Sequence, residues 1–130
     1  MDTTRNQPSA RRFLSWFIPF KRGLGSWAFA LNRITALGLT FYLFLHLVIL
    51  GKLAQGPEAY DQFLTLTENP IVKLGEWAVV AAAILHGLNG LRIILTSFGV
   101  GVTRQKQLFW GFMAVAAVCI LFFTAKMYLG

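Results

Sequence analysis

The sequence has 130 residues, of which 56% are hydrophobic and 13% charged, and its formal net charge is +7. A water-soluble protein of this size has a high ratio of surface to volume and needs many more charged side chains to cover it, so these proportions exclude an ordinary soluble domain. Five basic residues lie within the first 22 positions, and long stretches further along carry no charge, which is typical of a membrane protein with a basic cytoplasmic flank and not of a nucleic-acid-binding protein.

The first 23 residues form a basic and aromatic segment, which we separate from a membrane-spanning unit of residues 24–130. Residues 11–22 read RRFLSWFIPFKR, so cations are mixed with aromatic side chains and Pro19 interrupts the run. Such a segment can lie along the inner membrane surface or against a soluble partner docked there. A disordered basic tail fits the same residues equally well.

Three long apolar runs follow, at about residues 27–50, 74–98 and 107–129. Each reaches the roughly 20 residues that a helix needs to cross the hydrocarbon core, and a helix satisfies its own backbone hydrogen bonds there. The first run is too long and too far from the N-terminus for a cleaved signal peptide. The sequence therefore predicts an all-α membrane protein with three transmembrane helices.

The charges in the two connections predict the orientation of these helices. The second connection carries Arg104 and Lys106, whereas the first carries Glu58, Asp61 and Glu68 between its basic edges. Because basic connections stay on the cytoplasmic side, we expect the N-terminus in the cytoplasm and the C-terminus outside.

Ionisable residues inside the predicted spans are the candidates for function, because they are costly in lipid and usually face a bundle interior. They are Arg33, His46, Glu76, His86 and Arg92, and they include both histidines of the chain. A neutral histidine can ligate a metal, but it can also simply hydrogen-bond a neighbouring helix. An arginine near the end of a span can likewise extend to the lipid headgroups.

Small residues surround His86 on its helix. Gly90 shares a helical face with it, and this face would accept a bulky, flat group or, alternatively, close packing of another helix. Arg92 lies six residues after His86, about 9 Å along the axis on the cytoplasmic side. If His86 were the axial ligand of a haem, its propionates would come within reach of Arg92, a residue type suited to carboxylates.

His46 lies at a different depth, four residues before the outer end of the first run. The helical rise separates it from His86 by roughly 14–15 Å along the membrane normal. The two histidines therefore cannot ligate one iron, although they could serve two haems. Each haem would then need a second histidine from a partner subunit or a second copy.

The second span reads His86-x-x-x-Gly90-x-Arg92, followed by Phe98-Gly99. It resembles the HxxxGxR haem motif of the cytochrome b anchor subunits in the succinate dehydrogenase and fumarate reductase family. In the first span, Arg33-Ile34-Thr35 resembles the family's sequence near the quinone site. The resemblance covers about residues 24–129, and it is more specific in the second span than in the first.

Several positions depart from the family pattern. Phe29, Asn32 and Ala36 stand where the family often has Ser, His and Gly around the arginine of the first helix, and Ser97 replaces an Asp that many members have eleven residues after the haem histidine. Ser26, seven residues before the arginine and on roughly the same face, can substitute for the missing serine. The quinone site is thus less well matched than the haem site.

The resemblance implies the membrane anchor of a succinate:quinone oxidoreductase in a bacterial cytoplasmic (inner) membrane. In such a complex a flavoprotein subunit oxidises succinate, and an iron–sulfur subunit passes the electrons to quinone. The anchor itself has no active site for succinate; it carries electrons and holds the other subunits on the membrane.

The resemblance also implies the residues of each site. His86 would be an axial ligand of haem b, with Gly90 against the ring and Arg92 near the propionates. His46 is similar to a histidine of the two-haem anchors, so a second anchor subunit would supply the other two ligands. Ubiquinone or menaquinone would meet Arg33, Ser26 and Trp27, although Trp27 also fits a plain interfacial anchor.

Two other functions fit the same sequence. One is a b-type cytochrome subunit of another membrane oxidoreductase. The other is a structural or transport subunit whose histidines only join helices, although three unrelated spans show none of the internal repeats typical of transporters. A reduced-minus-oxidised spectrum separates a haem-binding subunit from a structural or transport subunit, because only the first gives a b-type signal.

Overall fold

The computed structural model describes residues 13–14 and 23–130. The segment proposed to lie on the membrane surface falls almost entirely outside the described residues. The remainder is helical: α2 (Leu24–Leu53), α3 (Pro57–Thr67), α4 (Pro70–Ser97), a short 3-10 turn (Val102–Arg104) and α5 (Gln105–Leu129). The prediction of an all-α chain is confirmed.

Three of these helical segments are long and apolar enough to cross a membrane, namely Leu24–Leu53, Pro70–Ser97 and Val102–Leu129. They coincide with the three predicted spans and begin three to five residues before them. Pro70 explains the earlier start of α4, because proline suits the first turn of a helix and the Asn69 side chain caps it by accepting from the Ile71 N–H at 2.9 Å. The orientation across the membrane remains a prediction.

Helix α3 was not predicted. It lies in the first connection and is polar enough to escape a search for long apolar runs. Pro57 in the first turn, followed by the acidic Glu58, is a recognisable start signal. Tyr60 and Phe63 then meet on one face, with ring centroids 6.4 Å apart, so α3 is amphipathic.

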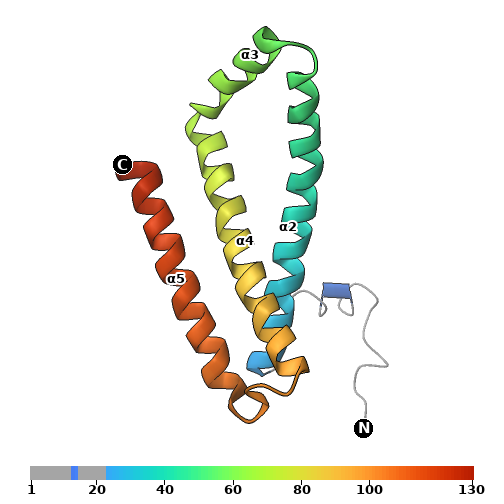
Figure 1. Ribbon diagram of the computed structural model, residues 1–130, viewed down its shortest axis with the longest axis vertical. Coiled ribbons are helices and arrows are strands. Elements are labelled where there is room, and N and C mark those ends of the chain that lie inside the picture. Colours follow the sequence, from blue (N-terminus) through green and yellow to red (C-terminus); the bar gives the residue numbers. More distant parts are fainter. Residues whose placement is uncertain (1–12, 15–22) are drawn as a thin grey trace.

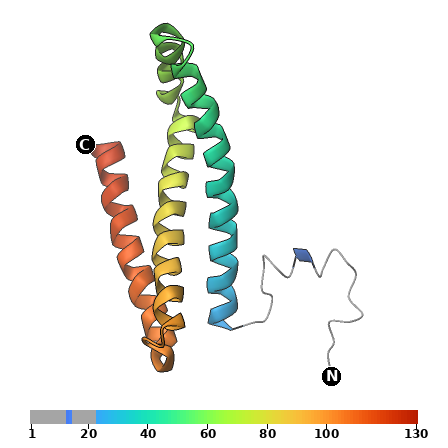
Figure 2. The same cartoon turned by 45° about the vertical axis from the view of Figure 1, so that its right-hand side comes forward.

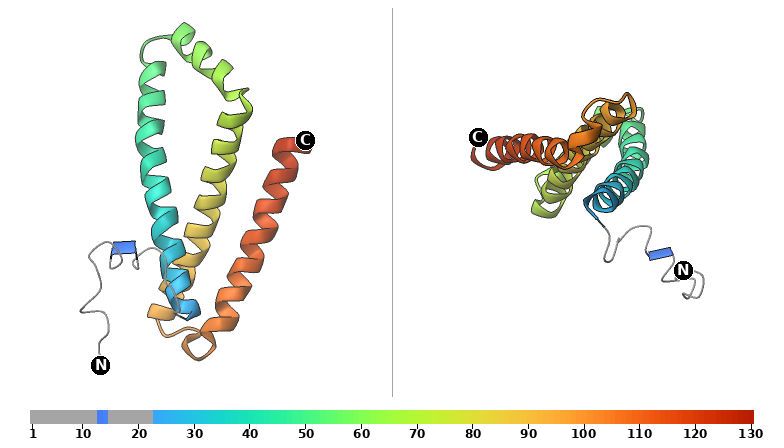
Figure 3. Two further views of the ribbon diagram at one scale, coloured as in Figure 1. Left: turned by 180° about the vertical axis from the view of Figure 1, so that it is seen from behind. Right: turned by 90° about the horizontal axis from the view of Figure 1, so that it is seen from below.

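Helix α4 lies between α2 and α5 (Figures 1 and 2). It runs antiparallel to both, and its contacts with α5 extend over most of its length, from the Trp77–Thr124 hydrogen bond to the stacking of Arg92 on Phe109. Helices α2 and α4 instead meet at one end only and diverge toward α3 (Figures 1 and 3). Helices α2 and α5 begin, and α4 ends, at the same end of the molecule, which we call the Leu24 end. We call the opposite end the α3 end.

The described helices bury very little apolar surface among themselves. The buried hydrophobic residues are Ala28, Ala30, Phe109 and Ala116, and three of these four are alanines. Small side chains let helix backbones approach closely in lipid. Many large apolar side chains of the described helices are exposed, as expected where lipid or another membrane subunit surrounds the chain.

Candidate functional site

Helices α2 and α4 are joined by Asn89, whose side chain is fully buried at 0% exposure. Its Nδ2 donates to the Ala28 carbonyl of α2 at 2.9 Å, and its Oδ1 accepts from Nε of Arg92 at 3.1 Å. No role for this residue was predicted from the sequence. A polar side chain inside an apolar span was the signal, because such a group needs a partner in hydrocarbon.

One turn nearer the membrane centre, His86 also contacts α2. Its Nδ1 lies 3.2 Å from the Asn32 carbonyl oxygen and 3.2 Å from Oγ1 of Thr35. A carbonyl oxygen only accepts, so the proton of a neutral imidazole must be on Nδ1. The Thr35 hydroxyl can accept as well, because it donates its own proton to the Leu31 carbonyl at 2.8 Å.

This arrangement leaves Nε2 of His86 with its lone pair available. In the part of the chain that the structure describes, no group donates a hydrogen bond to it. A histidine that donates one ring N–H to a carbonyl and keeps the other nitrogen free has the arrangement seen in metal-ligating histidines. The contacts thus form a bridge from α4 to α2 and at the same time leave Nε2 available to a ligand.

Gly90, on the same face of α4, also has free space beside it. A Cβ built there would meet no atom of the described chain within 4 Å, and the same is true at Gly87. Neither α2 nor α5 packs closely against these glycines. The close helix packing that the sequence left open as an alternative therefore does not occur among the described helices. The space suits a flat group or a helix of another subunit.

Arg92 is buried, at 7% exposure. Besides the Asn89 contact, its guanidinium lies over the Phe109 ring, with Cζ 5.6 Å from the centroid. It forms no ion pair with any described residue, since the described acidic residues, Glu58, Asp61, Glu68 and Glu76, all precede the middle of α4. A buried cation without a counterion calls for an anion from elsewhere.

His46 is exposed and lies far from His86. It is eleven residues beyond Thr35 on nearly the same face of α2, about 16 Å along the axis. There α2 and α4 have diverged, and its described contact is the Tyr42 ring, 5.6 Å between centroids. The structure thus does not bring the two histidines together, in agreement with the depths expected from the sequence.

The residues expected near quinone lie on another side of α2. Ser26 and Arg33 each lie two residues, roughly 200°, from the positions that face α4, Ala28 and Thr35. Arg33 is exposed, with its Cζ 5.6 Å from the Phe29 ring. Trp27 is 51% exposed. None of the three lines either of the two cavities found near the beginning of α5.

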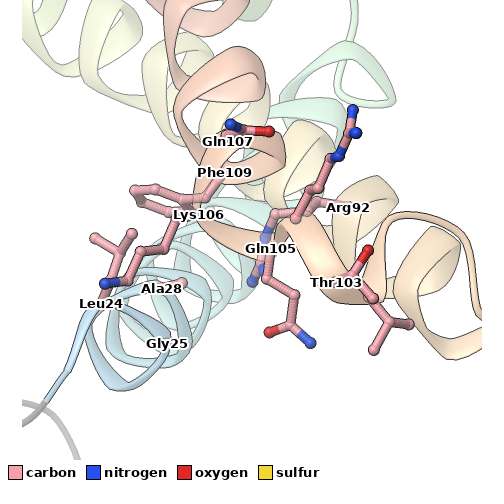
Figure 4. Close-up of a pocket in the computed structure, with 11 residues that line it drawn as sticks. Leu24, Gly25, Ala28, Arg92, Thr103, Gln105, Lys106, Gln107 and Phe109 are labelled. Atoms are coloured by element: carbon pink, nitrogen blue, oxygen red, sulfur yellow. The ribbon is translucent and has the colours of Figure 1, made fainter.

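A cavity of about 850 Å³ opens instead at the Leu24 end, between the first turn of α2, Arg92 of α4 and the beginning of α5 (Figure 4). Arg104, Lys106 and Phe109 are among the residues that line it. In the sequence, Arg104 and Lys106 indicate only the orientation of the helices. Only the fold brings them to Arg92.

Comparison with known proteins adds an independent observation. The sequence model of a family described as the succinate dehydrogenase/fumarate reductase transmembrane subunit matches residues 3–125. The chain is 36% identical over 87 residues to the succinate dehydrogenase 2 membrane subunit SdhC of Mycobacterium tuberculosis, a match that covers 66% of this chain and 64% of that protein. It is 33% identical over 98 residues to the succinate dehydrogenase hydrophobic membrane anchor subunit of Halobacterium salinarum, covering 75% of each.

The junction at Asn89 yields a test of stability. Asn89→Ala removes the amide and leaves the Ala28 carbonyl and the Arg92 guanidinium without this partner, so we expect the helix bundle to lose about 1–2 kcal/mol. The measurement is the free energy of unfolding in mixed micelles. Ser97→Ala, at an exposed position near the end of the same helix, is the control and should change it by less than about 0.5 kcal/mol. Equal losses of unfolding free energy in the two variants would contradict the role of Asn89 in joining α2 to α4.

Proposed function

Because this chain belongs to the succinate dehydrogenase/fumarate reductase transmembrane subunit family, we propose that it is a cytochrome b anchor that binds haem and contributes to a quinone site. The observation that carries the haem assignment is the environment of His86. Its Nδ1 is engaged by two oxygens of α2, which leaves Nε2 available for iron.

The residues around His86 fit a haem. The free Nε2 supplies an axial ligand, the Asn32 carbonyl fixes the ring orientation, and the space beside Gly90 accommodates a flat macrocycle. Arg92 supplies a cation for a propionate, since its Nε donates to Asn89 while its terminal nitrogens are left for an anion. When bound, the haem would supply a one-electron redox centre whose potential depends on its axial ligands and their hydrogen bonds.

His46 is proposed as the ligand of a second haem nearer the α3 end. Its exposure leaves the imidazole open to a group outside this chain. The distance between the histidines excludes one shared iron, so each haem takes its other histidine from a second membrane anchor subunit. The extensive apolar surface of α2 and the divergence of α2 from α4 give such a subunit room to pack.

The catalytic partners complete the proposal. A flavoprotein subunit oxidises succinate, an iron–sulfur subunit relays the electrons, and this chain binds both to a bacterial cytoplasmic membrane without an active site for succinate of its own. The Leu24 end, which directly follows the basic N-terminal segment in the sequence, then faces the cytoplasm, and the C-terminus lies outside.

Quinone is proposed to bind near the beginning of α2, at Arg33, Ser26 and Trp27. Arg33 can donate hydrogen bonds to a quinone carbonyl and stabilise the negative charge that develops on it during reduction. The Ser26 hydroxyl offers a second donor on the same face. These side chains lie on the face of α2 turned away from α4, so the rest of the pocket would come from partner subunits.

The two histidines should be separable by substitution in the purified complex. His86→Ala should remove one b-type haem and His46→Ala the other, each leaving its counterpart in place, because the ligands lie at different depths. Reduced-minus-oxidised spectra and haem extraction measure both. Full haem content in His86→Ala, or no b-type signal in the unaltered complex, would refute the proposal.

The Thr35 hydroxyl provides a finer test of how His86 is held. Thr35→Val keeps the shape but removes one of the two acceptors at Nδ1, and we expect haem affinity to fall about tenfold, as for other residues that orient a metal-bound histidine. Haem titration of the haem-depleted complex measures it. Thr40→Val is the matched control, since the exposed Thr40 donates only to the Ala36 carbonyl of its own helix. Unchanged affinity in Thr35→Val would rule out this role.

Substitution of Arg33 tests the quinone site. Arg33→Ala should lower kcat/KM for quinone about 10–100-fold, the usual worth of a hydrogen bond from a charged group, while succinate oxidation with a soluble dye acceptor stays unchanged. Lys52→Ala, a cation removed from the other end of the same helix, is the control. A loss of both activities together would indicate faulty assembly, and no loss of either would place quinone elsewhere.

A further inference from the structure

The cavity at the Leu24 end carries positive charge from three side chains. Arg92, Arg104 and Lys106 all line it, and they come from α4, the connecting turn and the first turn of α5. Every described carboxylate side chain lies in residues 58–76, toward the α3 end. Among the described residues, therefore, these cations have no acidic partner.

The backbone adds to this positive potential. Helix α5 has 25 residues and begins at Gln105 beside the cavity, with no side chain capping its N-terminus and no acidic residue in its first turn. The free N–H groups of a helix N-terminus attract anions, and basic residues placed there are unfavourable unless an anion is bound. The cavity is thus complementary to an anion.

A second, mostly apolar groove of about 530 Å³ begins where the first cavity ends. The two share Arg104 and Gln107, and the groove continues along α5 past Leu108 and Phe112 to Val115. Gly111 forms its floor, where a Cβ would meet no atom of the described chain within 4 Å. A cationic pocket therefore opens into an apolar channel that follows a membrane-spanning helix.

The geometry points to a binding site for one anionic phospholipid, with its phosphate at Arg104 and Lys106 and an acyl chain in the groove over Gly111. An amphiphile is required, because a free phosphate would leave the groove empty. A neutral quinone would fill the groove but leave the cations uncompensated. The pocket lies at the end of the span Val102–Leu129, where lipid phosphates lie in a bilayer.

Native mass spectrometry of the delipidated whole complex tests this site. The probes are phosphatidylglycerol and phosphatidylcholine with identical acyl chains. We expect the unaltered complex to hold one phosphatidylglycerol at least about tenfold more tightly than phosphatidylcholine, and R104Q/K106Q to lose that preference. The control K52Q/K126Q removes two cations at the α3 end and should keep it.

A second variant tests the groove without changing charge. G111L places a side chain into the open space and should weaken the binding of both lipids alike, while haem content and quinone reductase activity stay at the level of the unaltered complex.

Three results would each overturn the lipid site: equal binding of the two lipids, equal losses in R104Q/K106Q and the control, or unaltered lipid binding in G111L. Loss of haem from R104Q/K106Q with lipid binding intact would also overturn it and assign the cations to haem propionates, leaving the proposed function in place.

Discussion

Helices in hydrocarbon gain little by burying apolar surface against each other. The hydrogen bond from the Asn89 amide to the Ala28 carbonyl therefore fixes where α2 and α4 meet. The same amide accepts from Arg92 and so holds a buried cation in place. An amide left without partners in lipid would be costly, which makes this register much more favourable than one shifted by a turn. The positions of His86 against Asn32 and Thr35 follow from it.

The junction is confined to one end of the bundle. Beyond Thr35 the two helices diverge, His46 becomes exposed, and most large apolar side chains of α2 face outward. The described helices thus have a small internal core and one histidine at each of two depths. Their apolar surface is available to lipid or to another membrane subunit, in accord with the transmembrane subunit family to which the chain belongs.

Acidic side chains are confined to one end of the described molecule. They lie around α3, together with some lysines, while Arg92, Arg104 and Lys106 converge without a described carboxylate at the Leu24 end. This division is the basis of the predicted topology, because basic connections are usually retained in the cytoplasm. It also creates a site, because cations that share one cavity attract an anion more strongly than the same cations dispersed over a surface.

The sequence by itself determined the three spans, since length and hydropathy are local properties and lipid permits only a helix there. It also determined that His46 and His86 lie at different depths, because helical rise alone separates them. It did not disclose α3, whose apolar residues occupy a single face of a short, polar segment. Nor could it assign Asn89 a partner, choose the protonated nitrogen of His86, or bring Arg104 and Lys106 to Arg92. Those features depend on contacts between residues 12 to 61 positions apart in the chain, and only the register and crossing of packed helices decide which of them form.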